Sequence, residues 1–270
     1  MKRYLINNEL KRSIRKSGYS LRQIRQKLGF EVKNIYYRNL SINENHLKKL
    51  EEMLNLKIKL KEIKFDYVKN LGKYAYSEPV KPIRKNKELA EFIGIILGDG
   101  SVYKNTLNIT FDKRNTNYIE YVNNLFKETF NLKFKKRINP KRNEAHLYYY
   151  NQNLIKRLVK LGLKKGDKIK SQVGIPNWIK NNKLYSKRCI GGLIDTDGCI
   201  YFCKREKHIY IKFTNFNQQL LDDFKEVTKN LGYSFAKANK RNACLYRKDE
   251  VVRFINDIQP CKANGVIYNP

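Results

Sequence analysis

Two Asp-Gly pairs, each at the end of a short apolar run, are the residues best placed to do chemistry. Asp99 and Gly100 close the run FIGIILGDG, and Asp197 and Gly198 close the run IGGLIDTDG. Each run predicts a buried helix that ends at its Asp-Gly pair, where glycine favours a helix C-cap. A carboxylate at this end of a helix is unfavourable, because the negative end of the helix dipole lies there. Each aspartate therefore requires a compensating positive charge.

Small residues recur on one face of both runs. Gly94 and Gly98 are four residues apart, and Gly192 and Thr196 occupy the matching places. Residues at this spacing share a helix face, and small side chains there let two helix backbones approach closely. Glycine inside a helix costs about 1 kcal/mol relative to alanine, so a packing reason is expected. We predict that the two runs pack on each other.

This packing would bring Asp99 and Asp197 together. Two neighbouring carboxylates repel each other, and a divalent hard cation relieves the repulsion. Carboxylate-bound metals on a nucleic-acid-binding surface can hydrolyse phosphodiester bonds. We therefore expect these two aspartates to form a metal site for that reaction.

The segments that follow the two runs have the same order. Each run precedes two alternating segments, a helical run, two short strand-like segments and a closing helix. The sequence predicts an α+β fold of two αββαββα repeats, in residues 89–175 and 176–270. The expected segments are 101–104, 107–111, 115–130, 132–138, 145–150 and 153–161 in the first repeat, and 199–204, 209–213, 218–231, 234–238, 244–247 and 250–258 in the second.

A small all-helical domain is expected in residues 1–56. Apolar residues at helical spacing predict helices over 8–16, 21–28 and 31–38, with a fourth beginning at Asn43. Ser20 can cap the second helix and Gly29 can end it. Residues 57–88 lose this periodicity and contain Pro79 and Pro82, which predicts an extended basic linker.

The order GYS-LRQIRQKLG-FEVKNIYYRN in the first domain is similar to a helix-turn-helix of the phage-repressor type. This resemblance implies that the last helix enters the major groove of DNA. Its candidate DNA-binding residues are Lys33, Asn34, Tyr37 and Arg38. A small helical bundle that contacts proteins is the alternative.

The charge indicates a polyanionic partner. The 270 residues contain 57 Lys and Arg against 25 Asp and Glu, a formal charge of +32. We find no apolar run near the roughly 18 residues that span a bilayer, and no apolar signal core at the N-terminus. We expect a protein of the prokaryotic cytoplasm or an organelle, neither secreted nor membrane-bound. The five cysteines have no CxxC spacing, which favours reduced thiols.

The two Asp-Gly runs resemble the LAGLIDADG homing endonuclease family. Residues 190–198 match the motif that names the family, and residues 92–100 are a looser copy with Leu97 at the sixth position. The resemblance implies that Asp99 and Asp197 are catalytic ligands of Mg²⁺ or Mn²⁺, with Gly98 and Thr196 in the same candidate metal site. It also implies a basic residue beside each active site, and the candidates are Lys168, Lys170 and Lys262. Asp195 has no counterpart in the first copy, so we expect a local capping or salt-bridging role and not a ligand.

The alternating segments predict sheets with one apolar face and one hydrogen-bonding face. In the family these polar faces form a saddle over DNA, with strands in the major groove. The candidate base- or phosphate-reading residues are Tyr103, Asn105, Asn108, Thr110, Tyr201, Arg205, Tyr210, Lys212 and Thr214. Candidate phosphate contacts, which set affinity and not sequence, are Lys135, Arg137, Lys141, Arg142, Lys237, Lys240 and Arg241.

The leading interpretation is a monomeric, site-specific endonuclease that uses Mg²⁺ to cut double-stranded DNA and needs no organic cofactor and no protein partner. A non-cleaving DNA-binding regulator or an intron RNA-splicing maturase on the same scaffold is the first alternative. A helical protein-interaction module with a basic surface is the second. The chain does not begin with Cys or Ser and does not end in His-Asn, so we expect a freestanding or intron-encoded protein and not an intein.

Overall fold

The computed structural model describes residues 3–4, 6–38, 42–58, 60, 66–69, 77–80, 83–203 and 208–265. The chain forms two compact units, residues 1–82 and 83–270. Among the described residues no helix is both long and apolar enough to span a bilayer.

The first unit is helical, as its periodicity predicts. Helix α1 (Asn8–Lys16) and helix α2 (Leu21–Leu28) have the predicted bounds, and they are followed by α3 (Lys33–Arg38) and α4 (Glu44–Leu54). Ser20 and Gln23 form a reciprocal capping box at α2, and Gly29 ends that helix with a φ of 72°. Strand β1 (Arg3–Tyr4) pairs with β2 (Ile42–Asn43). The core of this unit comprises Leu10, Ile14, Ile24, Val32, Ile35, Tyr36, Ile42, Leu47, Leu50 and Ile58.

The interval predicted as an extended linker contains an antiparallel strand pair. Strand β3 (Asp66–Lys69) pairs with β4 (Ser77–Val80). Pro79 lies within β4, a two-stranded edge position where the missing proline N–H is tolerated.

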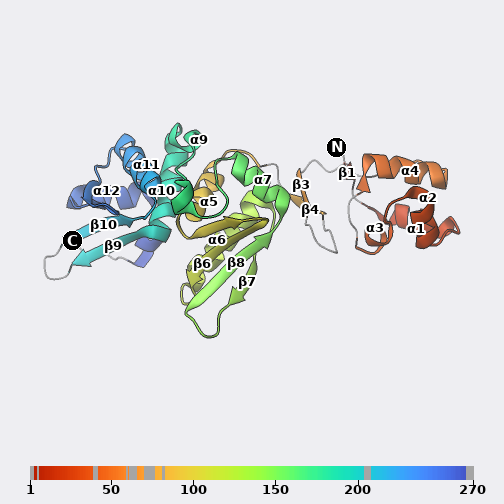
Figure 1. Cartoon of the computed structure of the whole chain (residues 1–270), viewed down its shortest axis with the longest axis horizontal. Helices are drawn as coiled ribbons and strands as arrows, with labels where there is room; N and C mark the ends of the chain where they lie inside the picture. Colours follow the sequence, from red (N-terminus) through yellow and green to blue (C-terminus); the bar gives the residue numbers. More distant parts are fainter. Residues whose placement is uncertain are drawn as a thin grey trace. The chain divides into compact units, whose positions relative to one another are not determined.

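The second unit contains the αββαββα order twice, so the expected α+β repeat fold is confirmed (Figure 1). The first repeat comprises α5 (Lys87–Gly98), β5 (Gly100–Tyr103), β6 (Thr106–Asp112), α6 (Thr116–Phe130), β7 (Lys135–Ile138), β8 (Glu144–Tyr150) and α7 (Gln152–Lys160). The second comprises α10 (Lys183–Asp197), β9 (Gly198–Cys203), β10 (His208–Thr214), α11 (Gln218–Asn230), β11 (Ala236–Asn239), β12 (Asn242–Leu245) and α12 (Lys248–Ile258). The short helices α8 (Lys168–Ser171) and α9 (Asn177–Lys180) connect the repeats, and the 3₁₀ turn η1 (Cys261–Gly265) follows α12.

Each repeat builds one antiparallel four-stranded sheet. The strand orders are β5-β6-β8-β7 and β9-β10-β12-β11, so the two sheets have the same topology. Residues alternate between buried and more exposed along β6, β8 and β10, as the sequence predicts. Phe202 interrupts this pattern on β9, where it is 38% exposed one residue before the end of the strand.

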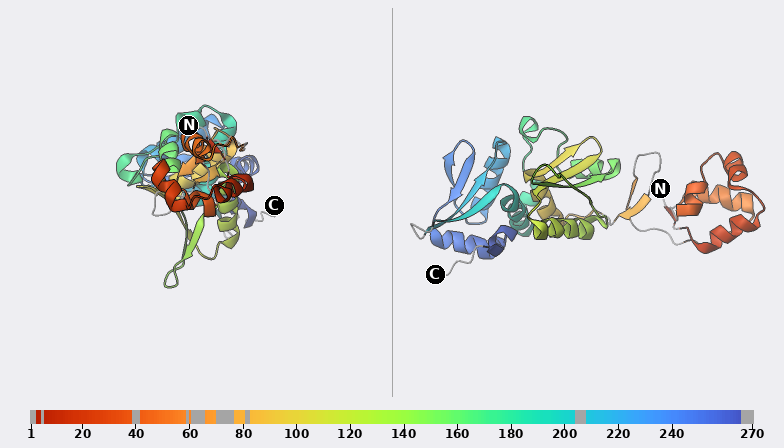
Figure 2. Two further views of the ribbon diagram at one scale, coloured as in Figure 1. Left: turned by 90° about the vertical axis from the view of Figure 1, so that its right-hand side faces the viewer. Right: turned by 90° about the horizontal axis from the view of Figure 1, so that it is seen from below.

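Aromatic side chains fill the space between each sheet and its helices. Phe92 packs against Phe126 and Phe130 in the first repeat, and Phe224 packs against Phe213 and Phe235 in the second. Helices α5 and α10 lie side by side in the middle of the unit, with one sheet on either side (Figures 1 and 2). The fold therefore places the ends of these two helices where the two sheets meet.

Candidate active site

The contact between α5 and α10, here called the seam, depends on glycine. A Cβ atom at Gly94 would collide with the backbone carbonyl of Cys189, and one at Gly192 would lie 2.6 Å from the carbonyl oxygen of Glu91. Glu91 and Cys189 occupy the same place in the two repeats, so the seam has a local twofold character. The prediction that the two runs pack on each other is confirmed.

The seam brings the two aspartates to one end. Asp99 caps the C-terminus of α5, and Asp197 is the last residue of α10. A Cβ atom on Gly98 would lie 3.4 Å from Oδ2 of Asp197, so that carboxylate lies against the last turn of α5. Burial, together with the negative charge of Asp99, raises the pKa of Asp197 to about 6. Desolvation also raises the pKa of Asp99, and the positive charges of Lys262 and Lys168 oppose this effect.

Two lysines provide positive charge at the helix ends. The ammonium group of Lys168 donates to the carbonyl oxygens of Leu97 (2.9 Å) and Gly98, and that of Lys262 donates to the carbonyl oxygens of Thr196 (2.9 Å) and Gly198 (2.6 Å). Burial lowers the pKa of both lysines, and the nearby aspartates oppose this effect. A cation at a helix C-terminus is stabilising. The structure thus brings Lys168 and Lys262 to the seam, whereas Lys170 is exposed on α8.

Gly98 and Thr196, the other two candidates for the metal site, lie in the last turns of α5 and α10. Their carbonyl oxygens accept from Lys168 and Lys262, and the hydroxyl of Thr196 donates to the carbonyl of Gly192 at 2.9 Å. Each lysine ammonium group therefore contacts the backbone carbonyl of one of these two candidate metal-site residues.

Asn215 is a site residue that the sequence analysis missed. Its side-chain amide donates to Oδ2 of Asp197 at 2.7 Å, and this bond favours the charged carboxylate. The equivalent residue in the first repeat is Lys113. The backbone N–H of Lys113 donates to the carbonyl of Asn143, and the backbone N–H of Asn215 donates to the carbonyl of Arg241 in the matching hairpin. Aligning FDKRN with FTNFN after the two central strands would have revealed the position, although not its hydrogen bond.

Asp195 anchors the segment that carries Lys262. Its carboxylate, which is buried, accepts the backbone N–H of Lys262 at 2.9 Å. This agrees with the capping role expected for Asp195.

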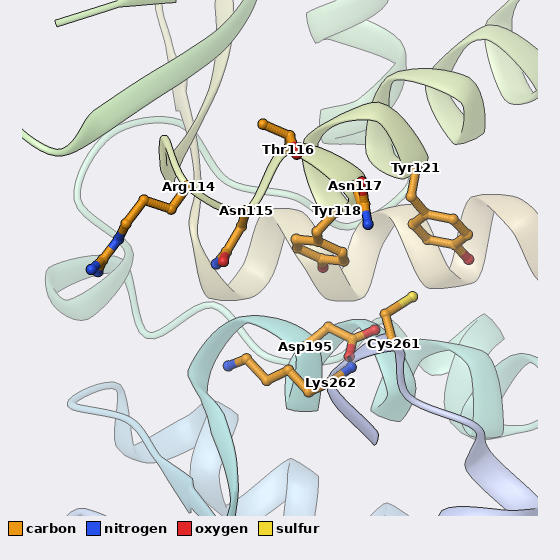
Figure 3. A pocket seen from close by; sticks show the side chains of 9 residues that line it. All are labelled: Arg114, Asn115, Thr116, Asn117, Tyr118, Tyr121, Asp195, Cys261 and Lys262. Carbon is orange, nitrogen blue, oxygen red and sulfur yellow. Dashed lines mark hydrogen bonds between the residues drawn. The ribbon is translucent and has the colours of Figure 1, made fainter. Parts of the chain in front are cut away.

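A cavity of about 600 Å³ lies beside Asp195 and Lys262, and the start of α6 lines its other wall (Figure 3). The hydroxyl of Tyr118 in this wall is buried and has no hydrogen-bond partner among the described residues. A second cavity of about 380 Å³ contacts Lys168, Asp197 and Asn215. Residues of both repeats line each cavity, and the second cavity reaches Asp197.

The predicted DNA-binding residues are distributed over the outward faces of the sheets. Tyr103 and Tyr201 are exposed on these faces. The half-buried residues of the same faces are Asn108, Thr110, Tyr210, Lys212 and Thr214. Asn105 lies in the turn between β5 and β6, and its carbonyl accepts the N–H of Asn151 at 2.8 Å. The basic residues Lys135, Arg137, Lys141, Arg142, Lys237, Lys240 and Arg241 are all exposed.

In the first unit, Lys33 and Tyr37 are exposed on α3. Asn34 and Arg38 belong to the same helix, and their side chains are not described. Arg205 lies outside the described residues.

The donor set at the seam suits a hard divalent cation. Two carboxylates from opposite helices meet at one place, and burial together with the charge of Asp99 raises the pKa of Asp197. Mg²⁺ is commonly held by one or two carboxylates and completes its shell with water and substrate phosphates. No group of three or more His, Cys, Asp or Glu that could hold a metal occurs among the described residues, so a structural zinc-type centre is not present in them.

Comparisons with known proteins agree with the second motif. Residues 185–258, which include Asp197, match the family model of the LAGLIDADG-like domain. The replication factor C small subunit of Methanocaldococcus jannaschii is 29% identical over 238 residues, which make up 84% of this chain and 12% of that protein. The chain therefore spans about an eighth of the length of this curated relative.

Three solved structures are among those similar to the chain. The homing endonuclease I-WcaI bound to its DNA recognition sequence is 18% identical, with a TM-score of 0.48 over 68% of this chain and 88% of that one. The N-terminal LAGLIDADG domain of DUF199/WhiA is 12% identical, with a TM-score of 0.46 over 70% and 86%. I-DmoI in complex with DNA and Mn is 18% identical, with a TM-score of 0.43 over 64% and 96%.

Proposed function

We propose that residues 83–270 form a divalent-metal-dependent endonuclease that hydrolyses both strands of a specific double-stranded DNA site. The observation that carries this proposal is the pair of carboxylates at one end of the seam, one from each repeat, each with its own lysine. Two repeats related in this way suit the two antiparallel strands of a duplex. Since both aspartates come from one chain, we propose that the protein acts as a monomer.

Each site residue has a distinct task in this proposal. Asp99 and Asp197 would hold Mg²⁺ or Mn²⁺, which when bound supplies a Lewis acid at a scissile phosphate. Lys168 and Lys262 place positive charge next to the carboxylates, where a phosphate anion must approach. Asn215 orients the carboxylate of Asp197 and keeps it charged.

The proposed activity is tested by incubating the protein with its flanking genomic DNA. Cleavage in Mg²⁺ that stops when EDTA is added supports the proposal. Binding of the same DNA without cleavage in either Mg²⁺ or Mn²⁺ would instead indicate a regulator, and selective binding of intron RNA would indicate a maturase.

The first unit is proposed to add affinity for DNA through α3. Residues 1–82 carry 20 basic and 8 acidic side chains. Removing them should weaken DNA binding and make its salt dependence shallower, since the slope is about −0.9 per neutralised phosphate on duplex DNA. Titrations of the full chain and of residues 83–270 at several salt concentrations measure this. Equal slopes for the two proteins would show that the first unit does not contact DNA.

The raised pKa of Asp197 predicts the pH dependence of cleavage. Only the ionised carboxylate binds the cation, so the rate should rise as pH increases through about 6. Asn215→Ala removes a bond that favours the ionised form, so this limb should move to higher pH. Without metal, a folded-state pKa above the ordinary 3.8 contributes stability below that value, and the contribution is lost as pH rises through about 6. Rate and melting profiles of the wild-type protein and of Asn215→Ala from pH 4 to 8 measure both effects. If the rates of the two proteins rise over the same pH range, Asn215 does not have this role.

A further inference from the structure

Three tyrosines form a continuous row across the outward face of the second sheet. Tyr201 on β9 lies directly opposite Tyr210 on β10, and their ring centroids are 5.2 Å apart. Tyr246, which follows β12, extends the row, with its ring 6.1 Å from that of Tyr210. Tyr201 and Tyr246 are 47% and 46% exposed. Rings of this size are usually buried, so a row of them on a polar face indicates a contact surface.

The first sheet has a comparable row, although its first two strands pair two residues out of step with those of the second sheet: Gly100 lies opposite Ile109, whereas Gly198 lies opposite Phe213. Tyr103 on β5 lies opposite Thr106 on β6, and Thr106 lies opposite Tyr150 on β8. Tyr103 and Tyr150 are 60% and 57% exposed. Each sheet therefore presents aromatic rings level with the residue four positions after its aspartate, and the residue between the outer rings is Thr106 in the first sheet and Tyr210 in the second.

The two rows lie at equal distances from the carboxylate pair. Tyr103 and Tyr201 each follow their aspartate by four residues, and a strand rises about 3.3 Å per residue. Base pairs in DNA are about 3.4 Å apart, so on a duplex whose axis runs along these strands each row would lie about three to four base pairs outward from the seam.

We propose that these rows contact thymine methyl groups in the major groove, so that the target site has A·T pairs at symmetric positions about three to four base pairs on either side of its centre. This inference rests on the proposed DNA endonuclease function and specifies its substrate. The thymine C5-methyl is the one apolar feature among the base edges of the major groove. Phenol rings offer apolar area to that methyl, and their hydroxyls can donate to neighbouring base acceptors. The preference is stronger in the half-site read by the second sheet, because three rings lie there against two.

The test uses the full chain and a random-sequence duplex library. Binding is selected in EDTA, so that the DNA is not cut, and the recovered duplexes are sequenced. The best duplex is then made again with deoxyuridine in place of each thymidine in turn, which removes only the methyl. We expect thymine enrichment at the two symmetric positions and about fourfold weaker binding for each methyl lost there, as burial of one such group implies.

Variants of Tyr210 assign this effect to the row. Tyr210→Ser leaves two rings, as in the first sheet, so it should reduce the difference between thymidine and deoxyuridine in its half-site to that of the other half-site, whereas Tyr210→Phe keeps the ring and should retain the full difference. Selection of a defined duplex without thymine at these positions, or equal binding of both nucleotides, would overturn the inference but leave the endonuclease proposal intact. Preference for single-stranded DNA would overturn it in favour of base stacking. Failure to select any duplex would contradict both proposals.

Discussion

Asp99→Asn or Asp197→Asn is expected to abolish double-strand cleavage and to leave DNA binding nearly unchanged. Each aspartate supplies the carboxylate that would hold a cation at a scissile phosphate, whereas affinity comes from the basic and polar faces of the sheets. The amide keeps the shape of the side chain and loses its charge. Cleavage and binding are measured on the same duplex, and we expect a rate loss of at least about a hundredfold, as for other residues that stabilise transition-state charge.

Asp222→Asn provides the matched control for these two variants. This aspartate lies on α11 and pairs with Lys225 at 2.7 Å, away from the seam. It should cut at the wild-type rate. If Asp99→Asn or Asp197→Asn also cut both strands at that rate, the carboxylate pair would not be the catalytic centre.

Gly192→Leu and Gly94→Leu are expected to destabilise the second unit by about 1–3 kcal/mol or more, because the seam leaves no room for a side chain. A Cβ atom at Gly192 already meets backbone of α5 at 2.6 and 3.0 Å, and backbone cannot rotate away. Activity should fall by more than stability explains, since displaced helices separate Asp99 from Asp197. Thermal melts and cleavage rates measure the two effects.

Neighbouring glycines in α10 allow a controlled comparison. A Cβ atom at Gly191 would lie 3.6 Å from Ile258, an ordinary contact, so Gly191→Ala should be neutral or slightly stabilising. Gly192→Ala makes the same chemical change on the seam face and should destabilise. Identical melting and cleavage for the two alanine variants would show that the seam does not position the site.

Much of the fold could be predicted from local pattern. Helices α1 and α2 have the predicted bounds, because their apolar spacing and their caps at Asn7, Ser20 and Gly29 agree. The third helix begins at Lys33 and not at residue 31, because the carboxylate of Glu31 lies outside the helix and accepts the N–H of Lys33. The strands of both repeats were predictable because one face of each is buried, which produces alternation of period two.

The site was predictable where it depends on the repeat, and not where it depends on loops. Asp99 and Asp197 follow from two copies of one motif. The choice of Lys168 over Lys170 depends on the direction in which α8 presents its residues, which adjacent lysines do not reveal. The sequence does not identify Asn215 as a site residue, because its role depends only on its proximity in space to Asp197. Strands β3 and β4 were missed because Pro79 and a loss of periodicity outweighed their short pairing.

The most direct test of the shared active site is to map both cut ends of a duplex cleaved by the wild-type protein in Mg²⁺. The two carboxylates lie together at one end of the seam, and the resemblance of the two motifs to the LAGLIDADG homing endonucleases implies that they reach the two strands across the minor groove. The proposed function predicts one cut in each strand with a short stagger of constant length, and no cut in EDTA. Blunt ends, cuts at variable spacing, or cutting of one strand only would contradict a single site built from both repeats.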